Sequence, residues 1–137
     1  MKQLMTIMIL LCCLRGTAQT AIAGADPRKV QMGAKTMKQY YFVMLTKGKG
    51  KDRVTDIASI NKLQEGHMAN IERLHREGKL MLAGPFGDDG NWRGIFVLDC
   101  ETSKEAEQLL ATDPMIKAGC LDYELRPWWT EMNSVFK

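Results

Sequence analysis

One histidine lies on the apolar side of a predicted helix, where a polar ring is unusual. Between about residues 55 and 77, His67 shares a three-and-four spacing with apolar residues that form one helical face: Ile57, Ile60, Leu63, Ile71 and Leu74. A histidine on a buried face needs a partner, because burial penalises an unpaired polar group. The commoner interpretation is a core histidine bonded to a backbone carbonyl. The alternative is an imidazole that transfers protons.

Asp113 is the candidate partner for this histidine. It precedes Pro114, which disfavours helical geometry in the residue before it, so a second predicted helix must end nearby. A turn carboxylate that bonds its own backbone is the ordinary interpretation. If the two helices pack side by side, the carboxylate can instead reach His67, fix its tautomer and leave the other ring nitrogen free for acid–base catalysis. His67 and Asp113 are therefore the candidate catalytic pair.

Other kinds of site lack a matching sequence pattern. His75 lies about 80° around the helix from His67, whereas two metal-binding histidines on a helix need a spacing of three or four residues. With no further histidine and no cysteine pair at metal-site spacing, we expect no metal. The sequence contains no glycine-rich dinucleotide motif and no Ser or Cys nucleophile motif, and we expect no cofactor.

The first residues of the chain have the pattern of a secretory leader. Lys2 supplies a positive start, and Leu4–Leu14 is an apolar run shorter than the roughly 20 residues that span a bilayer as a helix. Small residues at Gly16–Ala18 and at Ala21–Ala23 offer two cleavage points. We expect an exported protein, periplasmic or secreted, with no stable membrane association once the leader is removed.

Three alternatives to a cleaved leader stay open. Cys12 or Cys13 can carry a lipid anchor, the apolar run can stay attached as an anchor, or the chain can start at Met37 as a cytoplasmic domain. The expected organisation is a signal peptide, a linker, one domain and a short tail, over residues 1–23, 24–37, 38–130 and 131–137.

Composition indicates a globular domain with no electrostatic preference for polyanions. The 137 residues suffice for one domain, and 45% hydrophobic with 26% charged residues is ordinary for a folded chain. The net charge is +3, and Lys2 and Arg15 of the leader contribute to it without any acidic residue nearby. The mature domain is therefore close to neutral, which argues against nucleic acid or anionic membrane as a partner.

The order of predicted elements is β-α-β-β-α-β. Aromatic and β-branched runs predict four strands, at Tyr40–Thr46, Leu80–Phe86, Trp92–Cys100 and Leu121–Trp128. Gly78 is a natural end for the first helix, and Thr102 begins a capping box for the second. This order predicts an α+β, ferredoxin-like domain with two helices on one face of a four-stranded antiparallel sheet. In that fold Cys100 and Cys120 lie too far apart for a disulfide.

Two of the predicted strands are apolar on both faces. The first strand alternates Tyr41 and Val43 with Phe42 and Met44, and the run at 95–98 is apolar throughout. A sheet with one wet face should instead alternate apolar and polar residues. Something must therefore cover the second face, and a second copy of the sheet is the simplest cover. We expect a homodimer through the sheet face.

Short motifs along the chain resemble those of the YciI-like (YCII-related) family over about residues 38–129. They are Glu65-Gly66-His67-Met68-Ala69-Asn70-Ile71, Glu77-Gly78-Lys79-Leu80-Met81-Leu82-Ala83-Gly84-Pro85, Glu105-Ala106, Asp113-Pro114, Ala118-Gly119 and Pro127. The resemblance implies a dimeric α/β barrel and an active site built on a His–Asp pair, here His67 and Asp113. A similar family member dehydrochlorinates a chlorinated hydroxyquinol, and muconolactone isomerases share the fold. The export leader departs from this family, whose typical members are cytoplasmic.

Three hypotheses about function follow. The first is a small enzyme in which His67 transfers a proton on a small cyclic or carbonyl-bearing substrate, in an elimination or isomerisation, while Asp113 orients it. Gly84 and Pro85 would shape the substrate-binding wall, where backbone approaches the ligand. The second is a non-catalytic dimer that binds a small molecule in the same pocket. The third is a structural dimer with an ordinary core histidine.

Overall fold

The computed structural model describes residues 26–49, 54 and 56–134, so the expected leader lies outside the described residues. Within these ranges the elements are β1 Lys29–Met32, β2 Lys35–Lys47, α1 Ile57–Arg76, β3 Leu80–Pro85, β4 Trp92–Leu98, α2 Ser103–Leu110, α3 Pro114–Lys117 and β5 Leu121–Glu131. None of the helices described here is long and apolar enough to cross a membrane.

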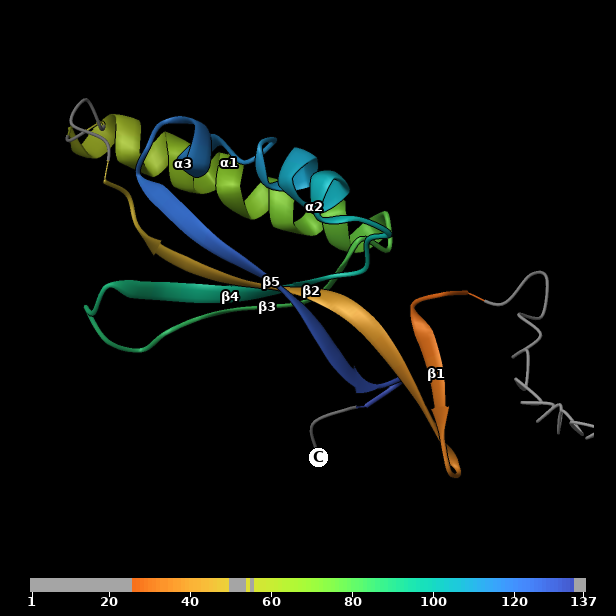
Figure 1. Ribbon diagram of the computed structural model, residues 1–137. Helices are drawn as coiled ribbons and strands as arrows, with labels where there is room; N and C mark the ends of the chain where they lie inside the picture. Colours follow the sequence, from red (N-terminus) through yellow and green to blue (C-terminus); the bar gives the residue numbers. More distant parts are fainter. Residues whose placement is uncertain (1–25, 50–53, 55, 135–137) are drawn as a thin grey trace, which may run out of the picture.

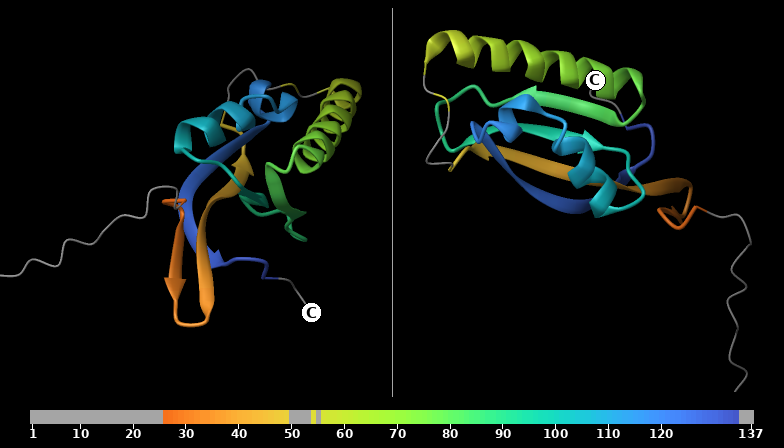
Figure 2. Two further views of the ribbon diagram at one scale, coloured as in Figure 1. Left: turned by 90° about the vertical axis from the view of Figure 1, so that its right-hand side faces the viewer. Right: turned by 90° about the horizontal axis from the view of Figure 1, so that it is seen from above.

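A single antiparallel sheet organises the domain, with β2 at its centre. β4 pairs with one edge of β2, β5 pairs with the other, and β3 lies outside β4. The three helices lie together on one face of this sheet (Figure 1), and the turned views show the same two layers (Figure 2). This arrangement confirms the predicted ferredoxin-like α+β fold.

Helix α1 begins and ends at the signals that its sequence carries. Asp56 is the N-cap, and its carboxylate accepts a hydrogen bond from the Ser59 backbone N–H at 2.8 Å. At the other end Gly78 has a φ of 68°, and the Lys79 backbone N–H donates to the Leu74 carbonyl at 2.9 Å. This is a Schellman termination, which needs a left-handed residue and so favours glycine. It turns the chain directly into β3.

Helix α2 forms one of the two hydrogen bonds of its predicted capping box. The Thr102 hydroxyl accepts from the Glu105 backbone N–H at 3.1 Å, as expected. The Glu105 carboxylate, however, accepts from the Glu101 backbone N–H at 2.9 Å rather than from Thr102. The helix ends at Leu110, shortly before Asp113, and α3 then starts at the proline. The short helix α3 was not predicted.

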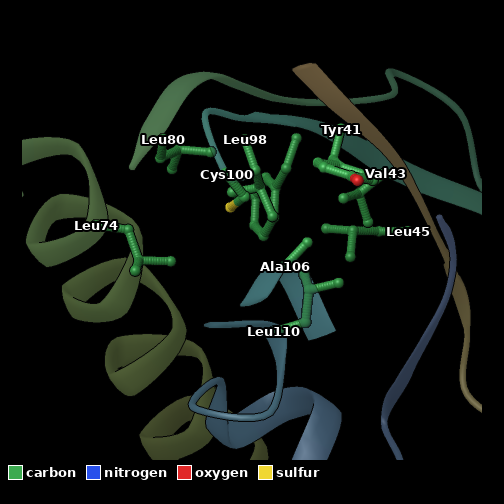
Figure 3. Close-up of a cluster of buried hydrophobic side chains, with 10 residues drawn as sticks. Tyr41, Val43, Leu45, Leu74, Leu80, Leu98, Cys100, Ala106 and Leu110 are labelled. Atoms are coloured by element: carbon green, nitrogen blue, oxygen red, sulfur yellow. The ribbon is translucent and has the colours of Figure 1, made fainter. Parts of the chain in front are cut away.

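The core lies between the sheet and the helices. Figure 3 shows the side chains that meet there from β2, β3, β4 and both longer helices. The buried cluster consists of Tyr41, Val43, Leu45, Leu74, Leu80, Phe96, Leu98, Cys100, Ala106 and Leu110. Cys100 and Cys120 are both free thiols, as the topology predicts, and burial raises the pKa of the Cys100 thiol to about 11.

The segment expected to be a linker contains a hairpin. Val30 in β1 lies opposite Met37 in β2, and Gly33 has a φ of 63°, which suits the tight turn between the two strands. Arg28, just before β1, donates to the Asp99 carboxylate at 2.7 Å and so attaches the hairpin to the end of β4. The linker predicted for residues 24–37 therefore contains regular structure, which the sequence does not reveal because a four-residue strand is too short to show a pattern.

The second face of the sheet is apolar on β2 and β4, whereas β5 adds Glu124 and Arg126 opposite Met44 and Phe42, and no described element covers this face. Phe42 lies opposite Val97 and Met44 lies opposite Ile95, on the face away from the helices, because the alternating residues Val43 and Phe96 lie in the core. Phe42, Met44 and Ile95 remain partly exposed in the single chain. The part of the outer face on β2 and β4 therefore has the character of a core surface rather than of a solvated sheet face.

Candidate active site

The two residues of the predicted pair are in contact. His67 Nδ1 lies 2.6 Å from Asp113 Oδ2. His67 comes from the middle of α1, and Asp113 is the N-cap of α3. The histidine is 8% exposed and the aspartate is fully buried. A bond this short between buried groups has the geometry of a charge-assisted hydrogen bond.

Close packing of α1 on α3 brings the pair together. A Cβ added to Gly66 would lie 2.8 Å from Cγ of Pro114, so a larger residue at position 66 would push the two helices apart. Pro114 occupies the first turn of α3, where its missing N–H costs nothing. Asp113 Oδ1 caps the same helix by accepting from the Met115 backbone N–H at 2.9 Å. The Asp-Pro step thus places one oxygen on the helix and leaves the other for the histidine.

The electrostatics of Asp113 determine the tautomer of the histidine. Burial acts to raise the pKa of Asp113, but the His67 hydrogen bond, the charge of that imidazole and the backbone N–H groups of α3 outweigh it, so this pKa is lowered. The carboxylate is then ionised near neutral pH and can only accept. His67 must therefore carry a proton on Nδ1, and in the neutral imidazole this leaves the Nε2 lone pair free. The His67 ring stacks on Phe96 at 6.0 Å between centroids.

A cavity of about 370 Å³ lies beside His67. The two residues predicted to form its wall, Gly84 and Pro85, do line it. A Cβ added to Gly94 would lie 2.7 Å from the Gly84 carbonyl oxygen, so the two strands behind the wall approach closely at glycines. The lining is mostly apolar and comprises Leu45, Gln64, His67, Met68, Ile71, Ala83, Gly84, Pro85, Arg93, Gly94, Phe96, Met115 and Leu121.

Two polar residues of the lining were not predicted. Gln64 lies three residues before His67 on α1. Residues with this spacing are neighbours on a helix surface, so the sequence could have indicated that Gln64 lies near His67. Arg93 lies where the pairing of β2 with β4 shifts register, and nothing in its local sequence marks it. Its ion pair with Asp89 is 3.8 Å long and Asp89 is fully exposed, so the pair neutralises the guanidinium only weakly. Arg93 can therefore interact with an anionic oxygen.

Comparison with known proteins identifies the family. The family model of the YCII-related domain matches residues 40–129. The chain belongs to the YCII-related domain family. This YCII domain is 27% identical over 89 residues to the uncharacterised protein YjpA of Bacillus subtilis (strain 168), across 65% of this chain and 94% of YjpA.

A solved structure is also similar to this YCII domain. It is 5-chloro-2-hydroxyhydroquinone dehydrochlorinase (TftG) from Burkholderia phenoliruptrix AC1100, in complex with 2,5-dihydroxybenzoquinone. The TM-score is 0.48 at 19% sequence identity, over 64% of this chain and 92% of the other.

The second histidine of the YCII domain lies apart from the pair. His75 Nδ1 lies 3.1 Å from the Leu80 carbonyl oxygen, so this nitrogen carries a proton and donates. His75 is exposed near the end of α1, as its angular position predicted. Within the described ranges, no group of three or more His, Cys, Asp or Glu side chains is arranged to hold a metal ion.

Proposed function

We propose that this YCII-related domain is a small enzyme in which His67 transfers a proton during an elimination or an isomerisation. The observation that carries the proposal is the 2.6 Å bond between His67 Nδ1 and Asp113 Oδ2 in a histidine that also lines the cavity. Because Nδ1 is engaged, Nε2 is the nitrogen available to a ligand. A buried carboxylate behind an imidazole is the usual way to orient a catalytic base and stabilise its protonated form.

The proposed chemistry uses only this pair. His67 Nε2 removes a proton from a carbon next to a carbonyl or enol, and the electron pair of that C–H bond forms a new double bond. In an elimination the electrons leave with chloride or another leaving group; in an isomerisation His67 returns the proton at a different carbon. While His67 holds the abstracted proton, Asp113 offsets the positive charge of the imidazolium. General base catalysis of this kind contributes about 10²- to 10⁴-fold in rate.

The cavity supports a small, largely apolar substrate. Its volume of about 370 Å³ is near the lower end for ligand sites. The backbone of Gly84 and Pro85 forms one wall, and the ring of Phe96 extends the stacked surface of His67. Arg93 offers the only cationic side chain among the lining residues. A small cyclic or carbonyl compound with one acidic or anionic oxygen suits such a lining.

We also propose that the domain works as a homodimer through the outer sheet face. Phe42, Met44 and Ile95 form an apolar surface that no described element covers, and burial of apolar area drives association. Sedimentation of the full chain at tens of micromolar should give a dimer. A monomer at that concentration would contradict this part of the proposal.

Turnover of a defined compound set tests the catalytic proposal. We would incubate the full chain with small cyclic ketones, enols and chlorinated phenols, and follow product mass and chloride release. His67→Ala should abolish any turnover found and keep ligand affinity within about tenfold, whereas Asp113→Asn should lower turnover by about 10²-fold or more. The matched control is His75→Gln, which changes the exposed histidine and should leave the rate unchanged.

The same variants separate catalysis from binding alone. If His67→Ala abolishes affinity for a compound that the wild-type protein binds without converting it, the site is a binding pocket. If His67→Ala keeps the wild-type turnover, the assignment of the general base is wrong. If His67→Leu changes stability little and nothing binds, the histidine is an ordinary core residue.

A further inference from the structure

A third buried polar side chain contacts the pair. Asn70 is 8% exposed and lies three residues after His67 on α1. Its amide nitrogen is 3.4 Å from Asp113 Oδ2, the same oxygen that His67 contacts. Its amide oxygen is 2.8 Å from Arg73 Nη2 and 2.9 Å from the Thr112 hydroxyl. Asn70 thus makes three polar contacts, one to Asp113 itself and two to Arg73 and Thr112 beside the pair.

Arg73 determines which way the amide of Asn70 points. A guanidinium has donors only, so the Asn70 atom at 2.8 Å from it must be the oxygen. The amide nitrogen then faces Asp113, whose ionised carboxylate accepts only. Arg73 is itself held in place, because Nη1 makes two bonds of 2.9 and 3.0 Å to the Glu77 carboxylate. The orientation of Asn70 is thus set independently of Asp113.

We propose that Asn70 is a positioning residue that holds the Asp113 carboxylate against His67. This inference rests on the proposed function, for which the orientation of His67 matters. The Asn70 N–H donates to Oδ2, the same oxygen that His67 contacts, and so restrains the carboxylate in the orientation that faces Nδ1. At 3.4 Å the contact is long for a hydrogen bond, and it orients the carboxylate electrostatically more than it binds it.

The same network anchors the chain segment that carries Asp113. Thr112 immediately precedes the aspartate and approaches both Asn70 Oδ1 and Arg73 Nη2, at 2.9 Å each. The contact of Gly66 with Pro114 anchors the following residue. Asp113 is therefore held on α1 from both sides along the chain. Small displacements of a catalytic base are costly in rate, and rigid support of this kind prevents them.

Asn70→Asp separates the donor role from simple packing. Aspartate has nearly the same shape and still accepts from Arg73, but it presents an oxygen where Asn70 presents its N–H. Two carboxylates then face each other across about the same gap, and this arrangement raises the pKa of one of them. Lowering the pH should protonate the pair and restore a donor. A purely structural Asn70 gives no such pH-dependent recovery.

The readout is hydrogen exchange of the His67 Nδ1 proton, measured by NMR on the ¹⁵N-labelled full chain. The wild-type protein should show a low-field Nδ1–H signal protected from water. Asn70→Ala and Asn70→Asp should each speed its exchange by about tenfold or more, since each removes a donor to a charged oxygen. For Asn70→Asp, the difference from wild type should shrink as the pH falls. Ala69→Gly is the matched control. Ala69 is an exposed residue of the same helical turn, so this change weakens the helix without removing a contact of Asn70.

The outcomes distinguish this inference from the proposed function. If Asn70→Asp exchanges as slowly as wild type at neutral pH, or if Ala69→Gly speeds exchange equally, the positioning role is wrong. Neither result depends on turnover. A protected Nδ1–H signal that requires Asn70 supports the positioning role of Asn70, even if no compound of the set is converted. A compound set without any product would count against the proposed function and not against this role.

Discussion

Gly66 and Pro114 touch where α1 crosses α3, and their contact sets the distance between His67 and Asp113. A Cβ at position 66 would lie 2.8 Å from the proline Cγ, closer than unstrained side chains approach. Each residue is the direct chain neighbour of one member of the pair. The spacing of the two helices at this point therefore limits how closely the imidazole and the carboxylate can approach.

Gly66→Ala should therefore destabilise the fold, although alanine is the better helix former. The gain in helix propensity is about 1 kcal/mol, while overpacking against the rigid proline ring costs about 1–3 kcal/mol. We expect a net loss in the free energy of unfolding and a weaker His67–Asp113 bond, seen as faster exchange of the Nδ1 proton. Gly87→Ala is the control, since a Cβ there meets nothing within 4 Å. A more stable Gly66→Ala protein with an unchanged Nδ1 signal would contradict this account.

The sequence offers the contact between His67 and Asp113 as one of two alternatives, and the resemblance to the YCII-related family favours it. Periodicity places His67 on the inward face of α1, and the Asp113-Pro114 step places a carboxylate at a helix end. The βαββαβ order then requires the two helices to pack side by side on one sheet face. Each step depends on local pattern or on topology, and both are properties of the sequence that a reader can recognise.

Features that depend on tertiary detail could not be predicted in the same way. Asn70 shares the His67 side of α1, but its role depends on how α1 is rotated against Thr112. Arg93 lines the cavity because the pairing of β2 with β4 shifts register there, and no local sequence motif predicts that shift. The β1 hairpin depends on a distant partner, because Arg28 bonds Asp99 across 71 positions of sequence.

The charge of Asp113 predicts an acid-dependent loss of stability. Its pKa in the folded protein lies below the unfolded value of about 3.9. The unfolded chain therefore binds more protons as the pH falls through that window, and the stabilising contribution of the carboxylate disappears. Asp113→Asn keeps the helix cap, because asparagine caps equally well. It should be less stable than wild type by about 3 kcal/mol at mildly acid pH, as expected when a buried pair loses one partner.

This difference in stability between wild type and Asp113→Asn should narrow as the pH is lowered from about 5. At that pH the imidazoles of an unfolded chain are already charged, so further change reports the carboxylate. Urea unfolding of both proteins across the acid range measures it. Other carboxylates titrate in both proteins and cancel in the difference. A gap that stays constant down to about pH 2 would mean that folding does not lower the pKa of Asp113.

Asp99 should hold the β1 hairpin onto the rest of the domain. It accepts from Arg28 at 2.7 Å and also pairs with Lys38, and these groups are largely buried. Asp99→Ala leaves Lys38 without its carboxylate and Arg28 with Asp26 alone, and it should cost about 1–3 kcal/mol locally, with faster amide exchange in residues 29–32. The exposed pair of Lys35 with Glu131 gives the comparison, and Lys35→Met should change stability by less than about 1 kcal/mol. If Asp99→Ala and Lys35→Met have equal effects on stability, Asp99 does not hold the hairpin in place.

Met44 lies at the centre of the proposed dimer surface, with Ile95 opposite it on the outer sheet face. Met44→Arg should prevent association, because burying a charge between two sheets costs several kcal/mol, and pairing with Glu124, its cross-strand neighbour on β5, offsets only part of that cost. In the monomer the arginine points into water, so the fold and the His67–Asp113 contact on the other face should persist. Sedimentation should shift from dimer to monomer at equal protein concentration, while the far-ultraviolet circular dichroism is retained. Ile57→Lys, on a side chain that is 77% exposed at the start of α1, should leave the dimer intact. A Met44→Arg protein that still sediments as a dimer would place the interface elsewhere on the molecule.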